Sequence, residues 1–470
     1  MSLLLLSLLS YTYSYHDWLN LPAMTDIVSV TTDNFDTYVA VPGGVYEITV
    51  TDGKLVRTIT RADGIRGEVQ AVAWDSQFAM LWILSSENLL NISPFSNQWF
   101  SYDLPDADVN SLGITRDYAI LSTGGRYWQV QKQTGITEET QPGNRSITWF
   151  GARNPYQVGD FPFLTPYLLY DRQLQPHQIT LVYPDGHRLW VGTEGLGVFL
   201  YNLSSKQQQK RWQFGPAGEI SRIFRLPDGL WFTGDEELAR YSPERDSWSY
   251  FSIPFNAVIN DPALLLRTKI LDLSWHEAIL TAAGDSNTLW LGTDQGIYSY
   301  RARSNVLTRQ FRINNNVNDI LIADDSVFLA TDAGFIAFDR ARGTWSIFDD
   351  TAQQMHFGVF GIGATSRRRY YAVYGGLETQ DSTGGWEMVI PPGFDLAAHP
   401  HALAGAGNRL FVATSQGVMV YNEQTGGWLT LNTDSGLPDR RILSLYADDR
   451  ALWVVTPAGI SRFDYHALFP

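Results

Sequence analysis

Acidic and amide side chains recur at one position of a repeated turn, and they are the first candidates for chemistry in this sequence. A threonine ends an aromatic-centred segment, polar residues follow, and a glycine then leads into the next apolar segment. The polar residues at these turns are Glu194, Asp294, Gln295, Asp332 and Gln416. Their oxygens accept hydrogen bonds, so grouped around a channel they would suit a hydroxyl-rich or cationic ligand. Polar residues also form turns that bind nothing, and this alternative stays open.

Other clusters of reactive residue types favour a plain structural role. Asp324-Asp325 and Asp448-Asp449 occupy equivalent turns, whereas paired catalytic carboxylates must face each other across a cleft. His399 and His401 alone are too few ligands for a metal ion. Arg367-Arg368-Arg369 could meet an anion, but a solvated hairpin turn is favoured. We therefore predict no catalytic residue, no metal site and no cofactor.

Composition excludes several classes of protein. The 470 residues carry a net charge of −15, which argues against binding to nucleic-acid phosphates or anionic lipid. Because cysteine is absent, disulfides, thiolate catalysis and iron–sulfur clusters are excluded. The sequence also lacks a phosphate-binding lysine loop, a serine elbow, a zinc-protease helix and a dinucleotide fingerprint.

One unit of about forty residues is repeated along the chain, and it must position these side chains. Leu189-Trp190-Val191-Gly192-Thr193 recurs as Leu289-Trp290-Leu291-Gly292-Thr293, with looser copies around Phe328, Phe411 and Trp453. Each unit contains four short alternating segments separated by turn residues, which is typical of a four-stranded propeller blade. Twelve of the 16 tryptophans fall at repeat positions, so we expect them to pack between strands rather than bind ligands.

The repeats predict an all-β fold, a β-propeller of about ten four-stranded blades. The last unit stops after its third strand, and the segment from Asp17 to Pro22 resembles the missing fourth strand. The N-terminal strand should therefore close the last blade. Ten blades exceed the usual four to eight. One large ring is favoured slightly over two smaller rings, because the inserts near 141–178 and 252–269 enclose only two units.

The N-terminus suggests export. Leu3 to Leu9 is apolar apart from Ser7, too short to span a bilayer but suited to a signal peptide over residues 1–14. The expected charged residue before this run is missing, so a buried strand is the alternative. Residues 15–470 then hold the propeller repeats. No later apolar run is long enough for a transmembrane helix.

The strand and turn at Leu289 to Tyr300 resemble the two-component regulator propeller repeat, and Leu189 to Tyr201 fits it with one extra turn residue. The resemblance covers about Trp18 to Asp464, with four or five good copies. It implies an exported propeller, either periplasmic or associated with the cell surface, like the sensing halves of glycan-responsive kinases or a type IX secretion-associated protein. Unlike the kinase members, this chain has no membrane span, kinase, DNA-binding segment or β-sandwich extension.

The favoured hypothesis is a non-catalytic exported module that binds a cell-envelope glycan or partner protein as a scaffold or sensor. The alternative is a propeller enzyme, either a polysaccharide lyase or glycosidase, or a quinoprotein, since Tyr421 to Trp428 resembles a quinoprotein docking segment. A third hypothesis makes the aromatic and proline-rich insert near 141–178 a protein-interaction platform. The ligand, the partner and the oligomeric state are not determined by the sequence.

Overall fold

The computed structural model describes the chain between Trp18 and Tyr465. Within it the described residues exclude positions 34, 52, 95–97, 142, 144–145, 171–175, 217–219, 227–228, 235–236, 244, 246, 253–278, 286–287, 302–305, 314, 324, 349–357, 381–384 and 393–402. The predicted signal peptide and the insert near 252–269, apart from Ser252, lie outside the described residues. No helix in the described part is long and apolar enough to cross a membrane.

Antiparallel sheets, mostly four-stranded, follow one another along the described chain, as the repeats predict, so the fold is all-β. We number them in chain order. Sheet 1 contains β2 (Ser29–Thr32), β3 (Asp36–Val41), β4 (Gly44–Thr49) and β5 (Leu55–Ile59), and sheet 2 contains β6 (Val69–Asp75), β7 (Met80–Ser85), β8 (Asn88–Ser93) and β9 (Gln98–Asp103). Sheet 3 contains β10 (Ser111–Ile114), β11 (Tyr118–Ser122), β12 (Tyr127–Gln131), β13 (Thr137–Thr140) and β14 (Thr148–Gly151). Sheet 4 contains β15 (Leu168–Tyr170), β16 (Pro176–Asp185), β17 (Arg188–Thr193), β18 (Val198–Asn202) and β19 (Gln207–Trp212).

Sheets 5 to 10 continue the pattern, and the described residues include four short 3-10 helices in the connections. Sheet 5 contains β20 (Ile220–Leu226), β21 (Gly229–Gly234), β22 (Glu237–Ser242) and β23 (Ser247–Ser252), and sheet 6 contains β24 (Ile279–Gly284), β25 (Thr288–Thr293), β26 (Gly296–Arg301) and β27 (Val306–Arg312). Sheet 7 contains β28 (Val317–Ala323), β29 (Ser326–Thr331), β30 (Gly334–Asp339) and β31 (Thr344–Phe348), and sheet 8 contains β32 (Gly361–Ala364), β33 (Arg369–Val373), β34 (Gly376–Gln380) and β35 (Trp386–Val389). Sheet 9 contains β36 (Leu403–Ala406), β37 (Arg409–Thr414), β38 (Gly417–Asn422) and β39 (Gly427–Leu431), and sheet 10 contains β40 (Ser444–Ala447), β41 (Ala451–Thr456), β42 (Gly459–Asp464) and β1 (Trp18–Pro22). The short helices are η2 (Arg61–Asp63), η3 (Val158–Asp160), η4 (Pro162–Leu164) and η6 (Thr433–Ser435).

The N-terminal strand completes the last sheet, as the truncated final repeat predicts. β1 pairs antiparallel with β42, with Trp18 opposite Phe463 and Pro22 opposite Gly459. The Trp18 ring stacks on Phe463 at a centroid distance of 4.4 Å. β1 therefore covers a strand edge that would otherwise be open.

The glycine of the Leu-Trp-x-Gly-Thr motif is required by the close approach of the next sheet. A Cβ atom on Gly292 would lie 2.6 Å from Val317 Cγ1, at the start of sheet 7. A Cβ atom on Gly192 would lie 2.6 Å from Ile27 Cβ, just before sheet 1. Gly292 of sheet 6 thus packs against the sheet that follows it in the chain. Gly192 of sheet 4 packs in the same way, but against the segment before sheet 1, which comes much earlier in the chain.

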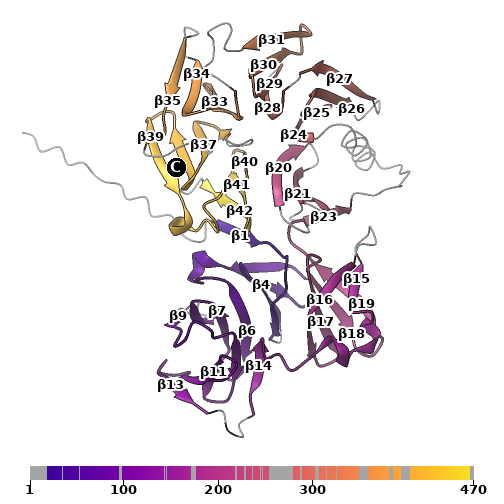
Figure 1. Ribbon diagram of the computed structural model, residues 1–470, viewed down its shortest axis with the longest axis vertical. Coiled ribbons are helices and arrows are strands. Elements are labelled where there is room, and N and C mark those ends of the chain that lie inside the picture. The colour runs from indigo at the N-terminus through magenta and orange to yellow at the C-terminus, as the bar shows by residue number, and fades with distance from the viewer. Residues whose placement is uncertain are drawn as a thin grey trace, which may run out of the picture.

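The first strand of each four-stranded repeat is one of β2, β6, β10, β16, β20, β24, β28, β32, β36 and β40. Contacts between these first strands arrange the sheets into two groups, which Figure 1 shows as a lower and an upper body. In the lower group β2 contacts β6 and β16, and β6 contacts β10. In the upper group contacts run from β20 through β24, β28, β32 and β36 to β40, and β40 contacts β20.

The contact between sheets 10 and 5 includes the same type of hydrogen bond that joins two pairs of consecutive sheets. A polar side chain early in one first strand accepts from a backbone amide of the next: Val72 N to Ser29 Oγ (3.2 Å) and Ile362 N to Asp319 Oδ2 (3.0 Å). Ile223 N donates to Ser444 Oγ at 3.3 Å. Sheet 5 therefore packs beside sheet 10 as a following sheet would.

The two groups share a continuous hydrophobic core. It contains buried residues of sheets 1 and 4, among them Tyr46 and Trp190, together with Phe232 of sheet 5 and Trp453 of sheet 10. Asn20 of β1 adds a polar contact across this junction, because its amide nitrogen donates to Thr60 Oγ1, directly after β5, at 3.4 Å. Both groups are therefore parts of one packed body.

Sheet 1 carries a titratable carboxyl whose pKa is displaced, which leads to a stability prediction. Partial burial, then Glu47 and Asp33, raise the pKa of Asp36 from 3.8 to about 6. The native state thus binds a proton more tightly than the unfolded chain, and its stability falls as pH rises from 4 to 6. Asp36→Asn should raise the free energy of unfolding by about 1 kcal/mol at pH 7.5, allowing for solvent screening, and leave it unchanged below pH 4. Denaturant unfolding at both pH values checks this, and equal effects at the two would contradict it.

Candidate functional site

The turns between second and third strands share one hydrogen-bonded construction. The buried hydroxyl of a threonine that ends the second strand donates to the carbonyl of the glycine beginning the third. The distances are 3.1 Å for Thr293 to Gly296, 2.8 Å for Thr331 to Gly334 and 3.0 Å for Thr414 to Gly417. This bond explains why a buried threonine ends the second strand at these turns.

The structure places the five predicted site residues on four such turns. Glu194, Asp332 and Gln416 are exposed, and Asp294 and Gln295 are half-buried. Asp294, Gln295, Asp332 and Gln416 belong to sheets 6, 7 and 9 of the upper group, whereas Glu194 belongs to sheet 4 of the lower group.

Two of these turns are also held by side chains of neighbouring segments. Asp332 Oδ1 accepts from Asn318 Nδ2 at 2.8 Å, and the same amide group donates to Val359 O at 2.9 Å. The carbonyl oxygen of Glu194 lies 2.8 Å from His177 Nδ1. Asp332 therefore has a structural contact in addition to any role in binding.

A central cavity of about 220 Å³ lies among the first strands of all six upper sheets. Each of β20, β24, β28, β32, β36 and β40 contributes at least three consecutive residues to its wall. Alanine and glycine are frequent among them, including Ala282, Gly363 and Ala404. Small side chains leave this space open, because larger ones pointing inward would fill it.

The polar groups of this cavity come from three strands. Arg225 of β20 is exposed and lines the wall together with Tyr446 of β40. Burial, then Asp448, raise the pKa of the Tyr446 hydroxyl to about 12, although Arg225 opposes the shift. At neutral pH the cavity therefore presents a guanidinium cation and a neutral phenol.

The carboxylate of the cavity is engaged by the backbone. Asp319 Oδ1 accepts from Ile320 N at 2.9 Å and Oδ2 accepts from Ile362 N at 3.0 Å. Burial lowers the pKa of Arg222, and the charge of Asp319 opposes that shift. Asp319 thus links sheet 7 to sheet 8 by accepting a backbone hydrogen bond from Ile362. The described wall residues include no second carboxylate with which Asp319 could share acid–base catalysis.

Sequence reasoning did not single out Arg222, Arg225 or Tyr446. Charged side chains are unusual on the first strand of a repeat, because alternate side chains of that strand pack into the core. The arginines at positions 222 and 225 are therefore the sequence feature that could have identified this site. The meeting of these arginines and Tyr446 with Asp319 depends on strands from three distant repeats. Among the described residues, no group of three or more His, Cys, Asp or Glu side chains could hold a metal ion.

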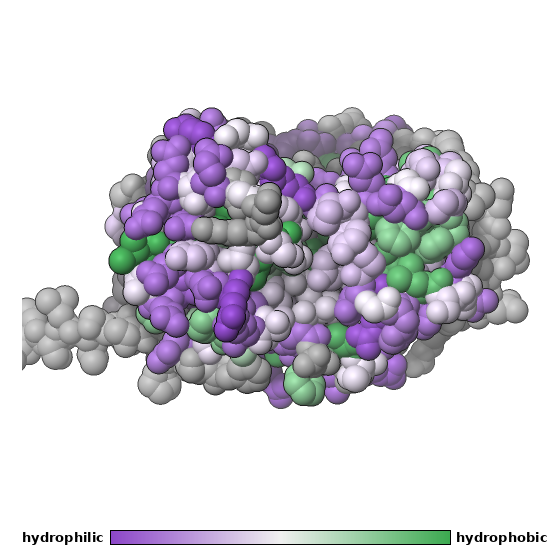
Figure 2. Space-filling model, turned by 90° about the horizontal axis from the view of Figure 1, so that it is seen from below, coloured by the Kyte–Doolittle hydropathy of each residue, from purple (hydrophilic) through white to green (hydrophobic). Residues whose placement is uncertain are grey.

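The described part of the insert near 141–178 packs on the lower group. β14 pairs with β10, and Leu164 of η4 is buried in a cluster with Val182 and Leu189. Phe161 and Phe163 pack partly exposed against it, while Tyr167 and Tyr170 are exposed. Figure 2, seen from below, shows a hydrophobic area on the side where Figure 1 places β15 to β19.

No protein-family model and no curated protein matches the sequence. The chain is similar in structure to the extracellular domain of the putative one component system BT4673 from B. thetaiotaomicron, with 15% identity and a TM-score of 0.38, covering 94% of this chain and 65% of that chain. It is also similar to PorZ, an essential bacterial surface component of the type-IX secretion system of Porphyromonas gingivalis. That match has 12% identity and a TM-score of 0.31, covering 95% of this chain and 87% of PorZ.

Proposed function

We propose that the chain is a non-catalytic, exported β-propeller module that binds a glycan or a partner protein of the cell envelope. The central cavity carries this proposal. It is walled by rigid strands, it presents Arg225 and Tyr446, and its carboxylate Asp319 is occupied by two backbone amides. Such a site is suited to hydrogen bonding a ligand and lacks a second carboxylate for glycoside hydrolysis among its described wall residues.

The proposal includes two propellers, of four and six blades, in place of the single large ring that the sequence slightly favours. In a single ring in chain order, β20 would neighbour β16 and β24, but it contacts β40, and Ile223 bonds to Ser444. The packing of Gly192 against Ile27 supports the same closure between sheets 4 and 1. Asp294, Gln295, Asp332 and Gln416 would then surround the mouth of the six-bladed ring, and Glu194 would belong to the other.

Capture from the envelope fraction of the source cell, with glycan-array probing of the same tagged protein, tests the function. We expect a specific glycan or envelope protein to be retained. Arg225→Gln should weaken its retention about tenfold, because a hydrogen bond to a charged group is lost. Glu139→Gln, on the peripheral strand β13, is the matched control and should bind as the wild type does.

Three results would separate the alternatives. Depolymerisation of a polysaccharide by the purified wild type, or a redox activity that depends on an added quinone, would overturn the non-catalytic proposal. Retention of a protein that is lost only when residues 152–170 are deleted would move the binding site to the insert. Equal binding by the wild type and Arg225→Gln would remove the central cavity from the proposal.

A further inference from the structure

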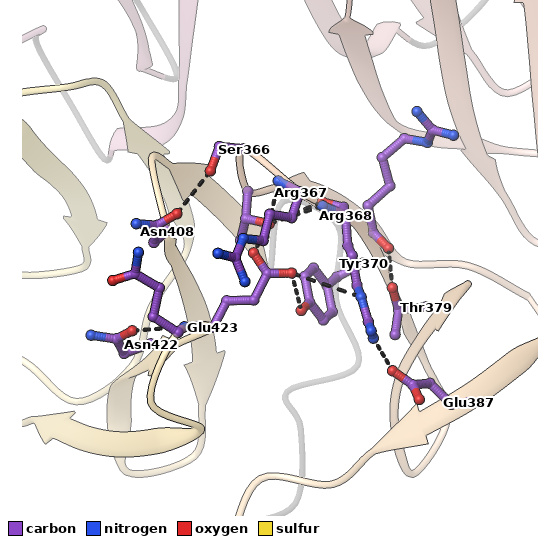
Figure 3. A network of polar contacts seen from close by, with 12 residues as sticks. Ser366, Arg367, Arg368, Tyr370, Thr379, Glu387, Asn408, Asn422 and Glu423 are labelled. Atoms are coloured by element: carbon purple, nitrogen blue, oxygen red, sulfur yellow. Dashed lines mark hydrogen bonds and ion pairs between the residues drawn. The ribbon is translucent and has the colours of Figure 1, made fainter. Parts of the chain in front are cut away.

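The turn between β32 and β33 carries three consecutive arginines and is held rigidly against sheet 9. Thr365 N donates to Arg368 O at 2.9 Å, which closes the hairpin. Ser366 N donates to Gly407 O at 2.6 Å, and Ser366 Oγ donates to Asn408 Oδ1 at 2.8 Å. Figure 3 shows this turn facing Asn408 and Glu423 of the neighbouring sheet. The arginines are therefore presented from a fixed backbone.

Arg368 is neutralised by the carboxylates of this region. It forms an ion pair with Glu387 of β35, and its Nε lies 4.0 Å from Glu423 Oε1. Glu423 in turn accepts from Thr365 Oγ1 at 2.7 Å and from the Tyr370 hydroxyl at 3.1 Å. Both glutamates are thus occupied by Arg368 and by the turn itself.

Arg367 and Arg369 have no ion pair with any carboxylate of the described residues. Both are exposed. The Arg369 guanidinium lies 4.4 Å from the centroid of the Phe328 ring and hydrogen-bonds the Tyr371 side chain. A guanidinium placed over a ring is held in position, while its remaining N–H groups can still donate.

A cavity of about 320 Å³ opens beside these side chains. Arg367, Arg368, Arg369, Tyr371 and Gln380 contribute to its wall. Ala364 lines both this cavity and the central one, so the two lie next to each other. Its size is at the lower end of the range for small-ligand pockets, which is roughly 300 to 1,000 Å³.

We propose that this cavity binds an oxyanion, either a phosphate or a carboxylate, of a small ligand. Arg367 and Arg369 supply cations that pair with no carboxylate of the described residues, and their fork-shaped donors match the planar carboxylate and the phosphate oxygens. The chain's net charge of −15 opposes anion binding elsewhere on its surface, which makes a rigid arginine turn distinctive. This site goes beyond the proposed function, because it is separate from the central cavity and recognises the opposite charge from the acceptor-lined turns.

Calorimetric titration of the full chain tests the proposal with inorganic phosphate and with glucuronate, using glucose as the uncharged match. We expect the wild type to bind at least one of the two anions more tightly than glucose, and more weakly as salt is added. The double variant Arg367→Gln/Arg369→Gln should lose at least about tenfold in affinity. Glu387→Gln should tighten binding a few-fold, since it leaves Arg368 with one carboxylate fewer; Glu387 is 46% exposed, so the fold should tolerate it.

Arg440→Gln/Arg441→Gln is the matched control, since these arginines are also adjacent and exposed and line neither cavity. It should bind like the wild type, and thermal melts should show all variants folded.

Preference for phosphate would identify a phosphate ester as the source of the anion, and preference for glucuronate would identify a uronic acid. Absence of binding to both anions, equal affinity in the Arg367/Arg369 variant, or weaker binding by Glu387→Gln would each overturn the proposal. None of these results depends on the envelope ligand of the central cavity.

Discussion

Replacing Lys132 by methionine is expected to lower the free energy of unfolding by about 3 to 5 kcal/mol. Lys132 Nζ lies 2.6 Å from Asp75 Oδ2, and both side chains are almost fully buried, at 2% and 3% exposure. Lys132 also donates to Thr115 O at 2.6 Å. Its loss leaves the Asp75 carboxylate buried without its counter-ion, between sheets 2 and 3. Denaturant unfolding of the wild type and the variant measures the difference.

An exposed ion pair of the same region provides the control. Arg66 Nη1 lies 3.2 Å from Asp103 Oδ1, with 52% and 86% of the side chains exposed. Arg66→Met should therefore cost less than about 1 kcal/mol. The double variant Asp75→Leu/Lys132→Met should recover part of the stability, because no charge is left buried. A Lys132→Met effect as small as that of Arg66→Met would show that the buried pair does not stabilise this junction.

Replacing Trp18 by alanine should destabilise the protein by about 3 to 5 kcal/mol, since a large buried ring is removed. Trp18 is 7% exposed and belongs to a cluster with Phe463, Leu452 and Leu437. Because β1 completes sheet 10, we expect the loss to loosen the C-terminal strands as well. Hydrogen exchange of Gly459–Asp464, followed together with denaturant unfolding, measures both effects.

Trp99 occupies the equivalent fourth strand of sheet 2 and serves as the matched control. It is only half-buried, on a strand that is otherwise largely exposed. Trp99→Ala should cost about 1 kcal/mol and leave exchange in β42 unchanged. Equal losses for the two variants would contradict the special role of the N-terminal strand.

Much of the fold could be predicted from the sequence, because a propeller blade is a local structure. Strand positions follow from two-residue alternation and from turns such as Asp448-Asp449, and the missing fourth strand of the last repeat pointed to β1. The buried threonine and glycine of each turn also lie within a few residues of each other. Interactions between nearby residues leave a pattern that a single sequence displays.

The candidate site was predicted less completely, for the opposite reason. The five polar turn residues were identified by their repeat position, but the sequence did not show that Glu194 lies in a different group of sheets from the other four. Arg225, Asp319 and Tyr446 come from repeats far apart in the chain, and they line one cavity only because six first strands converge. The pocket beside Arg367 and Arg369 depends in the same way on sheet 9 holding the turn.

The repeating unit, the all-β class, the net negative charge and the pairing of the N-terminal strand could all be predicted from the sequence. Which sheets are neighbours became evident only from the packing of distant repeats. Ser444 bonds to Ile223 with the same type of side chain and the same geometry that Ser29 uses toward Val72. Nearly identical repeats offer similar surfaces to one another, so local chemistry permits several closures. Which sheets become neighbours depends on long-range packing, in which Gly192 meets Ile27 and the residues of four sheets share one core.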